Sequence, residues 1–166
     1  MTEEELLPLL EESARRHGLS PALVRALIWK ESRFRPDAIG AKGELGLMQV
    51  TKGAAQDWAR VHKTTRPRRR QLLDPERNLE IGCWYLARAW EHWDGYLSQE
   101  SLALAEYNAG RTQVLRNWKP AAPGTPLHLE EITFPETRDY IQSILRQKAL
   151  YEAGEYSIPP TDSPLS

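Results

Sequence analysis

The sequence has little cysteine, little net charge and no long apolar run. A single cysteine, Cys83, excludes an internal disulfide framework. The formal net charge is −1, so no overall field would attract nucleic acid or an anionic membrane surface. No apolar run reaches the roughly 18 residues that a membrane-spanning helix requires. These shortages argue against a disulfide scaffold, a basic nucleic-acid binder and a membrane-spanning protein.

Metal-ligand clusters and a leader are also absent from the pattern. The four histidines are scattered along the chain without metal-ligand spacing, so we expect neither a metal nor another cofactor. The acidic, amphipathic N-terminus lacks the positive region and apolar segment of a signal peptide. Either the protein is cytoplasmic as it stands, or a leader or anchor has been removed from it. Composition leaves both open.

Helical periodicity runs along almost the whole chain, and strand signals are nearly absent. We therefore expect a mainly α fold, with one domain over residues 1–154 and a disordered tail at residues 155–166. Capping residues and prolines place the helix starts. The expected starts are Thr2, Ser20, Thr51, Asp74, Ser98 or Ser101, Arg111 and Pro135.

Prolines and charges refine this pattern. Pro8 should weaken the first helix or delay its start. The helix that begins after Ser20 should end near Phe34, because Pro36 disfavours helical geometry in the residue before it. The basic run at residues 66–70 is short and contains a proline, so we interpret it as a solvated surface loop, with anionic cell-wall polymers as a lesser possibility.

Glu31 is the first residue whose position points to chemistry. It follows Leu27 by four residues and Ile28 by three, so it shares their apolar helix face. Burial would raise the pKa of its carboxyl group and keep it protonated, as a general acid in a glycosidase must be. The plainer interpretation is a glutamate that pairs with Arg25 or Lys30, or one exposed at a frayed helix end.

Two further segments could line a groove beside such an acid. The loop after Glu31 contains Gly40, Gly43 and Gly46, which permit backbone conformations closed to other residues. Later in the chain, Tyr107 and Asn108 adjoin a glycine that ends a helix. A Tyr hydroxyl can orient a carboxylic acid, and an Asn amide can hold an acetamido group of a sugar. Each segment alone also fits an ordinary loop or turn.

Together with a fourth block, these segments resemble the soluble lytic transglycosylase (SLT) family. The resemblance covers residues 15–152, and the blocks occur in the family's order at compatible spacing. The blocks are ESRFRPDA at 31–38, GLMQV at 46–50, AEYNAG at 105–110 and FPETRDY at 134–140.

The resemblance implies a lysozyme-like helical domain with a long sugar-binding groove. Members of this family cleave the β-1,4 bond between N-acetylmuramic acid and N-acetylglucosamine in peptidoglycan. The 6-hydroxyl of the muramic acid attacks its own anomeric carbon, so no water is consumed and a 1,6-anhydro end remains. By this resemblance Glu31 would first protonate the departing oxygen and then accept a proton from the attacking hydroxyl.

Other site residues follow from the same resemblance. Met48 and Gln49 would line the groove beside the reacting sugar. Tyr107 would orient Glu31 or the substrate, and Asn108 would hold groove structure or an acetamido group. Glu136 would lie near the site, although a glutamate in the first turn of a helix is equally explained by the helix dipole.

The chain departs from the family pattern near the loop. Where the family often has a serine after the Pro-x-Ala element, this sequence has Gly40. Glu44 stands where an alanine is common, and it could bind substrate, take over the role of the missing hydroxyl, or face solvent. We favour the solvent-facing orientation.

Three other functions remain to be distinguished. A hydrolase of the goose-type lysozyme kind shares the fold and the GLMQ block, but it needs a further carboxylate after that block, where this chain has Thr51. A non-catalytic peptidoglycan-binding module would keep the groove and cut nothing. A nucleic-acid binder using residues 66–70 is the least favoured. The expected product of a hydrolase is one water heavier than an anhydro end.

The substrate also implies a setting. We expect peptidoglycan glycan strands as the partner and no nucleic acid. We expect a periplasmic or cell-envelope location, with membrane contact only through an anchor removed from this sequence. We further expect a monomer.

Overall fold

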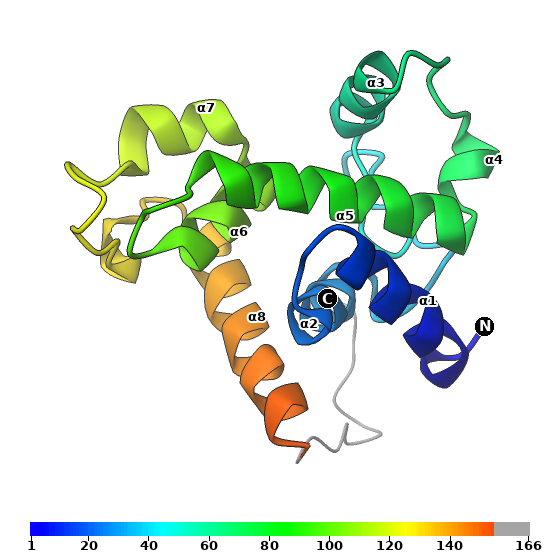
Figure 1. The fold of residues 1–166 in the computed structure, drawn as a ribbon, viewed down its shortest axis with the longest axis horizontal. Helices are drawn as coiled ribbons and strands as arrows, with labels where there is room; N and C mark the ends of the chain where they lie inside the picture. Colours follow the sequence, from blue (N-terminus) through cyan, green and yellow to red (C-terminus); the bar gives the residue numbers. More distant parts are fainter. Residues whose placement is uncertain (155–166) are drawn as a thin grey trace. The chain divides into compact units, whose positions relative to one another are not determined.

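The computed structural model describes residues 1–154, and the regular secondary structure of this part of the chain is helical, apart from two isolated β-bridges (Figure 1). The mainly α prediction is confirmed, and the predicted tail at residues 155–166 lies outside the described residues. In chain order the helices are α1 (Glu3–Arg16), α2 (Pro21–Ser32), α3 (Lys52–Val61), α4 (Arg69–Leu72), α5 (Pro75–His92), α6 (Gln99–Ala109), α7 (Arg111–Gln113), the π-helix η1 (Val114–Trp118), the 3-10 helix η2 (Leu129–Glu131) and α8 (Pro135–Ala153).

The described residues form two compact units. Residues 1–84 with 144–154 make up the first unit, and residues 85–143 make up the second. The helices α5 and α8 each begin in one unit and end in the other. Within residues 1–154, no helix combines the length and apolar character needed to cross a membrane.

Local capping chemistry sets the start of α1. The Thr2 side chain accepts a hydrogen bond from the Glu5 amide at 3.2 Å, and the Glu5 carboxylate accepts one from the Thr2 amide at 2.7 Å. This reciprocal capping box satisfies two amides that would otherwise lack partners. The start predicted at Thr2 is therefore confirmed, and Pro8 is accommodated inside the helix without delaying it.

The helix α2 begins as predicted and ends earlier than predicted. Ser20 caps it by accepting a hydrogen bond from the Leu23 amide at 3.2 Å, with Pro21 at the first helical position. It ends at Ser32 because Arg33 and Phe34 both adopt left-handed backbone conformations, with φ of 53° and 62°. A left-handed conformation is uncommon for residues other than glycine, and bulky Phe34 is an outlier.

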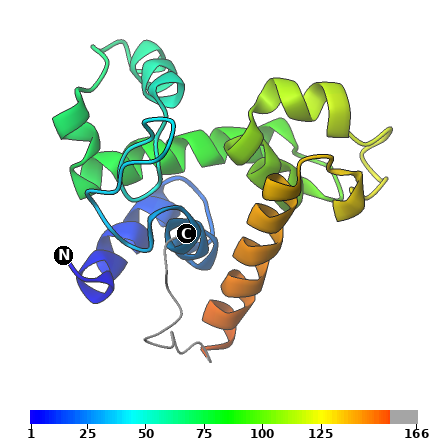
Figure 2. The same ribbon diagram turned by 180° about the vertical axis from the view of Figure 1, so that it is seen from behind.

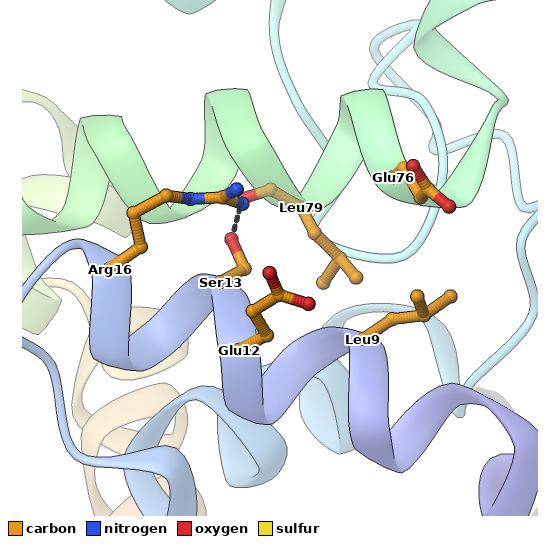
Figure 3. Close-up of a pocket in the computed structure, with 6 residues that line it drawn as sticks. All are labelled: Leu9, Glu12, Ser13, Arg16, Glu76 and Leu79. Carbon is orange, nitrogen blue, oxygen red and sulfur yellow. Dashed lines mark hydrogen bonds between the residues drawn. The ribbon is translucent and has the colours of Figure 1, made fainter.

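The core of the first unit forms where α1, α2 and α5 pack. Figure 1 shows α1 and α2 side by side, and Figure 2 shows the same unit from behind. Ser13 on α1 donates a hydrogen bond from its hydroxyl to the Leu79 carbonyl of α5 at 3.2 Å (Figure 3). Side chains from these helices with 0 or 1% exposure include Leu6, Leu10, Leu23, Val24, Leu27, Ile28 and Leu79.

The basic segment is only partly a loop. The prediction placed residues 66–70 in a surface loop, but α4 begins at Arg69. The helix is one turn long because the Arg68 amide donates to the Gln71 side chain at 2.8 Å and Leu72 is buried. The arginine side chains of this segment are nevertheless exposed, as expected.

In the second unit, α6 begins after Ser98 rather than Ser101. The Ser98 hydroxyl accepts a hydrogen bond from the Leu127 amide at 2.8 Å, and the Leu97 amide donates to the Pro123 carbonyl at 2.8 Å. These bonds hold the segment at residues 119–132 in place. The helix predicted from Arg111 begins as α7 and continues as the π-helix η1.

Cys83 is a buried thiol in the first unit. Its side chain is 0% exposed, and its sulfur lies 3.9 Å from the Met48 sulfur. Burial raises the pKa of the Cys83 thiol to about 12. At pH 8 roughly one molecule in ten thousand would carry the reactive thiolate.

We therefore expect the folded protein to resist a thiol reagent such as Ellman's reagent at pH 8. After unfolding in guanidinium chloride it should release one equivalent of the coloured product. Because Cys83 is the single cysteine, all signal comes from this position. Full reaction of the folded protein within the mixing time would contradict the burial described above.

Candidate functional site

Glu31 occupies the second-to-last position of α2 in the first unit. One turn earlier, Leu27 and Ile28 are fully buried, which confirms that this helix face packs into the core. Glu31 itself is half-buried, so it is less enclosed than its place on the apolar stripe predicts. A half-buried carboxyl group at a helix end keeps access to solvent and to a substrate.

The backbone turns sharply directly after this glutamate. Arg33 and Phe34 are both left-handed, and Phe34 is 7% exposed. The Arg33 guanidinium lies over the Trp29 ring, 4.0 Å from its centroid, which favours a cation–π interaction. Consecutive left-handed residues persist only where surrounding packing stabilises them, and such strain is frequent at functional sites. The turn fixes where the chain leaves Glu31.

The following loop folds back on itself through short backbone pairings. Leu45 and Val50 exchange two backbone hydrogen bonds, of 3.1 and 2.9 Å, at the base of a turn. The Gly46 amide donates to the Ala38 carbonyl at 2.8 Å. This turn carries Met48 and Gln49, so both predicted site residues sit on a segment with a defined shape.

Asn78 on α5, which no motif in the sequence singled out, anchors this turn. Its amide nitrogen donates to the carbonyls of Leu45 and Leu72, at 2.8 and 2.7 Å, while its amide oxygen accepts from the Met48 amide at 2.8 Å. The residue is 0% exposed. Gly46 is left-handed, with φ of 79°, and a Cβ there would collide with the Asn78 amide. The close approach therefore requires both residues.

A sequence signal for Asn78 exists in retrospect. Asn78 and Gly82 are four residues apart on α5, so they share one helix face. Both face the turn, since a Cβ on Gly82 would collide with the Met48 side chain. A polar side chain and a glycine at this spacing on a buried helix indicate that another backbone approaches.

Met48 is 0% exposed in this arrangement. It packs against Gly82 and Cys83 on α5. These contacts place the Met48 side chain between the turn and α5. A contact between Met48 and a sugar stays a prediction.

The Gln49 side chain connects the turn to the backbone at Ala38. Its side-chain nitrogen donates to the Gly46 carbonyl at 2.9 Å and to the Ala38 carbonyl at 3.3 Å. Its backbone is left-handed, with φ of 51°. The residue is 9% exposed, so its side chain first of all stabilises the loop. The predicted groove-lining role stays a prediction.

Gly40 and Glu44 are structurally coupled. The Glu44 carboxylate accepts a hydrogen bond from the Lys42 backbone amide at 2.7 Å. The backbone carbonyl of Glu44 accepts one from the Gly40 amide at 2.8 Å. A Cβ at position 40 would lie 2.5 Å from the Gln49 side-chain oxygen and 2.9 Å from a Glu44 carboxylate oxygen. Glu44 is half-buried and its carboxylate lies beside Gly40, so its side chain is only partly exposed to solvent, and its role toward a substrate stays a prediction.

In the second unit, the AEYNAG block ends α6 at Gly110, whose φ is 92°. Tyr107 is half-buried and meets the Tyr85 ring edge to face, with centroids 5.7 Å apart. The Asn108 side-chain oxygen accepts a hydrogen bond from the Thr137 hydroxyl at 2.7 Å. This bond joins the third motif block to the fourth.

Glu106 in this block is a buried acidic residue with two polar partners, and no role was predicted for it from the sequence. Its carboxylate, 4% exposed, interacts with the His92 ring nitrogen Nδ1 at 2.7 Å and accepts from the Trp93 indole nitrogen at 2.9 Å. A buried carboxylate requires such partners. Glu106 therefore holds the end of α5 against α6 within this unit.

Glu136 lies exposed in the first turn of α8, while its neighbour Thr137 is 1% exposed. An acidic side chain in this turn is favoured by the helix dipole. The first-turn interpretation therefore accounts for Glu136, and its place in a substrate site stays a prediction.

The four motif blocks thus lie two in each compact unit. In the first unit, the loop connects Glu31 with Glu44, Met48 and Gln49. In the second unit, one hydrogen bond brings the segments of Asn108 and Glu136 together, with Tyr107 alongside.

Comparison with known proteins identifies the family to which these motif blocks belong. A family model described as the Transglycosylase SLT domain matches residues 8–124, which include the segment from Glu31 through Tyr107. The chain belongs to the transglycosylase SLT family. The predicted family is thereby confirmed, and the solved structures described below confirm the lysozyme-like helical fold.

This SLT chain is similar to proteins named membrane-bound lytic murein transglycosylase C. Those of Yersinia pestis and Yersinia pseudotuberculosis are 35% identical to it over 116 residues, covering 66% of this chain and 32% of the relative. The SLT chain therefore spans about a third of the length of the curated relatives it matches.

Solved structures agree with the family assignment. Lytic transglycosylase Slt of Pseudomonas aeruginosa, solved as an inactive mutant with glutamine in place of glutamate, matches with a TM-score of 0.76 and 29% identity. The match covers 90% of this SLT chain and 24% of that protein. A 70-kDa soluble lytic transglycosylase in complex with bulgecin A matches with a TM-score of 0.73 and 26% identity, over 94% of this chain and 25% of that one.

Proposed function

We propose that this SLT domain cleaves peptidoglycan glycan strands as a lytic transglycosylase, with Glu31 as its general acid and base. The observation that carries the proposal is the position of Glu31. A half-buried carboxyl group ends α2, directly before a strained turn, in a chain of the SLT family. The glutamate-to-glutamine mutant of the Pseudomonas protein, described as inactive, supports a catalytic glutamate in this family.

The proposed reaction needs one carboxyl group and no water. Protonated Glu31 donates its proton to the glycosidic oxygen as the bond to the anomeric carbon breaks. The 6-hydroxyl oxygen of the same muramic residue then bonds to that carbon, and the Glu31 carboxylate takes the hydroxyl proton. The cycle leaves Glu31 protonated again. An attacking group already tethered to the substrate makes this closure efficient.

The other candidate residues supplement this chemistry in the proposal. Tyr107 would orient the reacting groups. Asn108, with its side-chain oxygen engaged by Thr137, would support the site through structure or hold an acetamido group with its amide. Glu136 and Glu44 would contribute polar contacts to the sugar, and Met48 and Gln49 would shape the loop next to it.

A hydrolase is less well supported by the loop. An enzyme that activates water needs a second carboxylate beside the scissile bond. After the GLMQ block the chain has Thr51, whose hydroxyl caps α3 by accepting from the Ala54 amide at 3.0 Å. The nearby Glu44 carboxylate is engaged by the Lys42 amide. Neither residue is placed like a free general base. A non-catalytic binding module would have no need of a half-buried glutamate at the end of α2, directly before the strained turn at Arg33 and Phe34.

Digestion of purified sacculi tests the proposal. We expect mass spectrometry to find products with 1,6-anhydro-muramic ends, each one water lighter than a hydrolysed end. A parallel digestion in water labelled with oxygen-18 should leave these ends unlabelled. A muramidase that hydrolyses the same bond serves as the positive control for label uptake. Free reducing ends that carry the label would favour the lysozyme-like alternative, and intact sacculi would favour the binding module.

The same proposal sets the location and partners. The glycan strands lie in the cell envelope, so the domain would act in the periplasm or at the cell surface. The relatives named membrane-bound are compatible with an anchor elsewhere in a longer protein. We propose a monomer that acts on peptidoglycan and not on nucleic acid.

A further inference from the structure

A cavity of about 250 Å³ lies in the first unit and plays no part in the proposed chemistry. Its walls come from the loop after Glu31, from α3 and from the segment that leads into α4. All of these segments belong to residues 43–72, so the cavity is built within one unit.

The floor of this cavity is apolar. Leu45 and Val50, the paired residues at the base of the turn, line it together with Ala55 of α3 and Leu72 of α4. All four side chains are at most 8% exposed. An apolar floor favours a ligand with an aliphatic part, because burying that part removes apolar surface from water.

The wall and rim carry positive charge. Lys52, Arg66 and Arg69 line the cavity and are exposed. Among the ion pairs of the described residues, none joins a carboxylate to these three side chains. The chain as a whole is nearly neutral, so this local excess of positive charge is not a general property of its surface. Unpaired cations around one cavity favour an anionic occupant.

We propose that this cavity binds the free carboxylate end of a peptide stem of peptidoglycan. A stem ends in a small aliphatic residue with a free carboxylate, and so it matches both the floor and the rim. A phosphate polymer or a nucleic acid would gain nothing from the apolar floor. The cavity is smaller than the roughly 300 Å³ at which pockets for drug-sized ligands begin, so it would take one or two residues.

This assignment rests on the proposed function for its substrate and adds a second contact to it. Leu45 and Val50 belong both to the cavity floor and to the turn that carries Met48 and Gln49. A stem held here would therefore pack against the same loop that follows Glu31. The basic run at residues 66–70 would serve as a carboxylate-binding segment rather than a merely solvated one.

Calorimetric titration with the stem tetrapeptide L-Ala-γ-D-Glu-meso-diaminopimelate-D-Ala tests the proposal. The unmodified protein should bind it, and amidation of the terminal D-Ala carboxylate should weaken binding about tenfold or more, as expected for losing a charge-assisted contact. The combined variant Lys52→Gln, Arg66→Gln and Arg69→Gln should weaken binding by at least as much. Arg15→Gln, which removes an exposed charge on α1, is the matched control and should bind normally.

The three single variants guard against misfolding of the combined one, and each should weaken binding while its thermal unfolding stays unchanged. Absence of tetrapeptide binding at millimolar concentration would overturn the proposal. So would equal binding of the amidated peptide, or tighter binding of a teichoic acid fragment. Digestion of intact sacculi, measured as release of anhydro-muropeptides, reports separately on the proposed function. Tetrapeptide binding without any glycan cleavage would refute the transglycosylase and leave the carboxylate site standing.

Discussion

Glu31→Gln should lower the rate of glycan-strand cleavage by about two orders of magnitude or more. The amide that replaces the carboxyl group can neither donate an acidic proton to the glycosidic oxygen nor accept one from the 6-hydroxyl, and losing a general acid–base group has effects of this size. The two side chains have nearly the same shape, so the fold should be retained. The rate is measured as release of soluble anhydro-muropeptides from sacculi, followed by mass spectrometry.

Glu152→Gln provides the matched control for this experiment. It makes the same change in charge at an exposed position near the end of α8, in the same unit as Glu31. We expect its activity to equal that of the unmodified protein. If Glu31→Gln cleaved sacculi at a near-normal rate, the assignment of the acid would be wrong, whatever the family.

Asn78→Ala should destabilise the fold by about 3 kcal/mol or more. The substitution removes three hydrogen bonds of 2.7 to 2.8 Å and leaves the Met48 amide and the carbonyls of Leu45 and Leu72 without that partner in a fully buried place. The Leu45 carbonyl keeps its bond from the Val50 amide, whereas the Met48 amide and the Leu72 carbonyl lose their partner, and each buried polar group left unsatisfied costs about 1–3 kcal/mol. Urea unfolding followed by tryptophan fluorescence gives the free energy of unfolding.

Asn117→Ala, at an exposed position of η1, makes the same truncation on the surface. Its effect should stay within about 0.5 kcal/mol, the usual range for such sites. A loss at Asn78 no larger than that at Asn117 would show that the turn does not depend on its anchor.

Helix starts were predictable because their causes are local. Thr2, Ser20 and Thr51 each cap a helix through a side chain that accepts from an amide three residues later. Such bonds form between neighbours in the sequence and are legible without the fold. The end of α2 was predicted two residues too late because Arg33 and Phe34 take left-handed conformations. A glycine would have indicated such conformations in the sequence, and neither residue is a glycine. Packing elsewhere imposes them.

The candidate site was legible only in part, for a similar reason. Periodicity located Glu31, and the family blocks named the loop and the AEYNAG segment. The residues that hold these segments were missed because their partners are distant in the chain. Asn78 bonds to Met48 and Leu45, which lie 30 and 33 residues earlier. Glu106 interacts with His92, 14 residues earlier.

The crowding around Gly40 makes three positions of the loop epistatic. A side chain there would overlap the places now taken by Gln49 and Glu44. Replacing the glycine with the serine that the family often carries would therefore require the end of the Gln49 or Glu44 side chain to shift first. The order in which substitutions accumulate along a lineage would then decide which of them are tolerated at this loop.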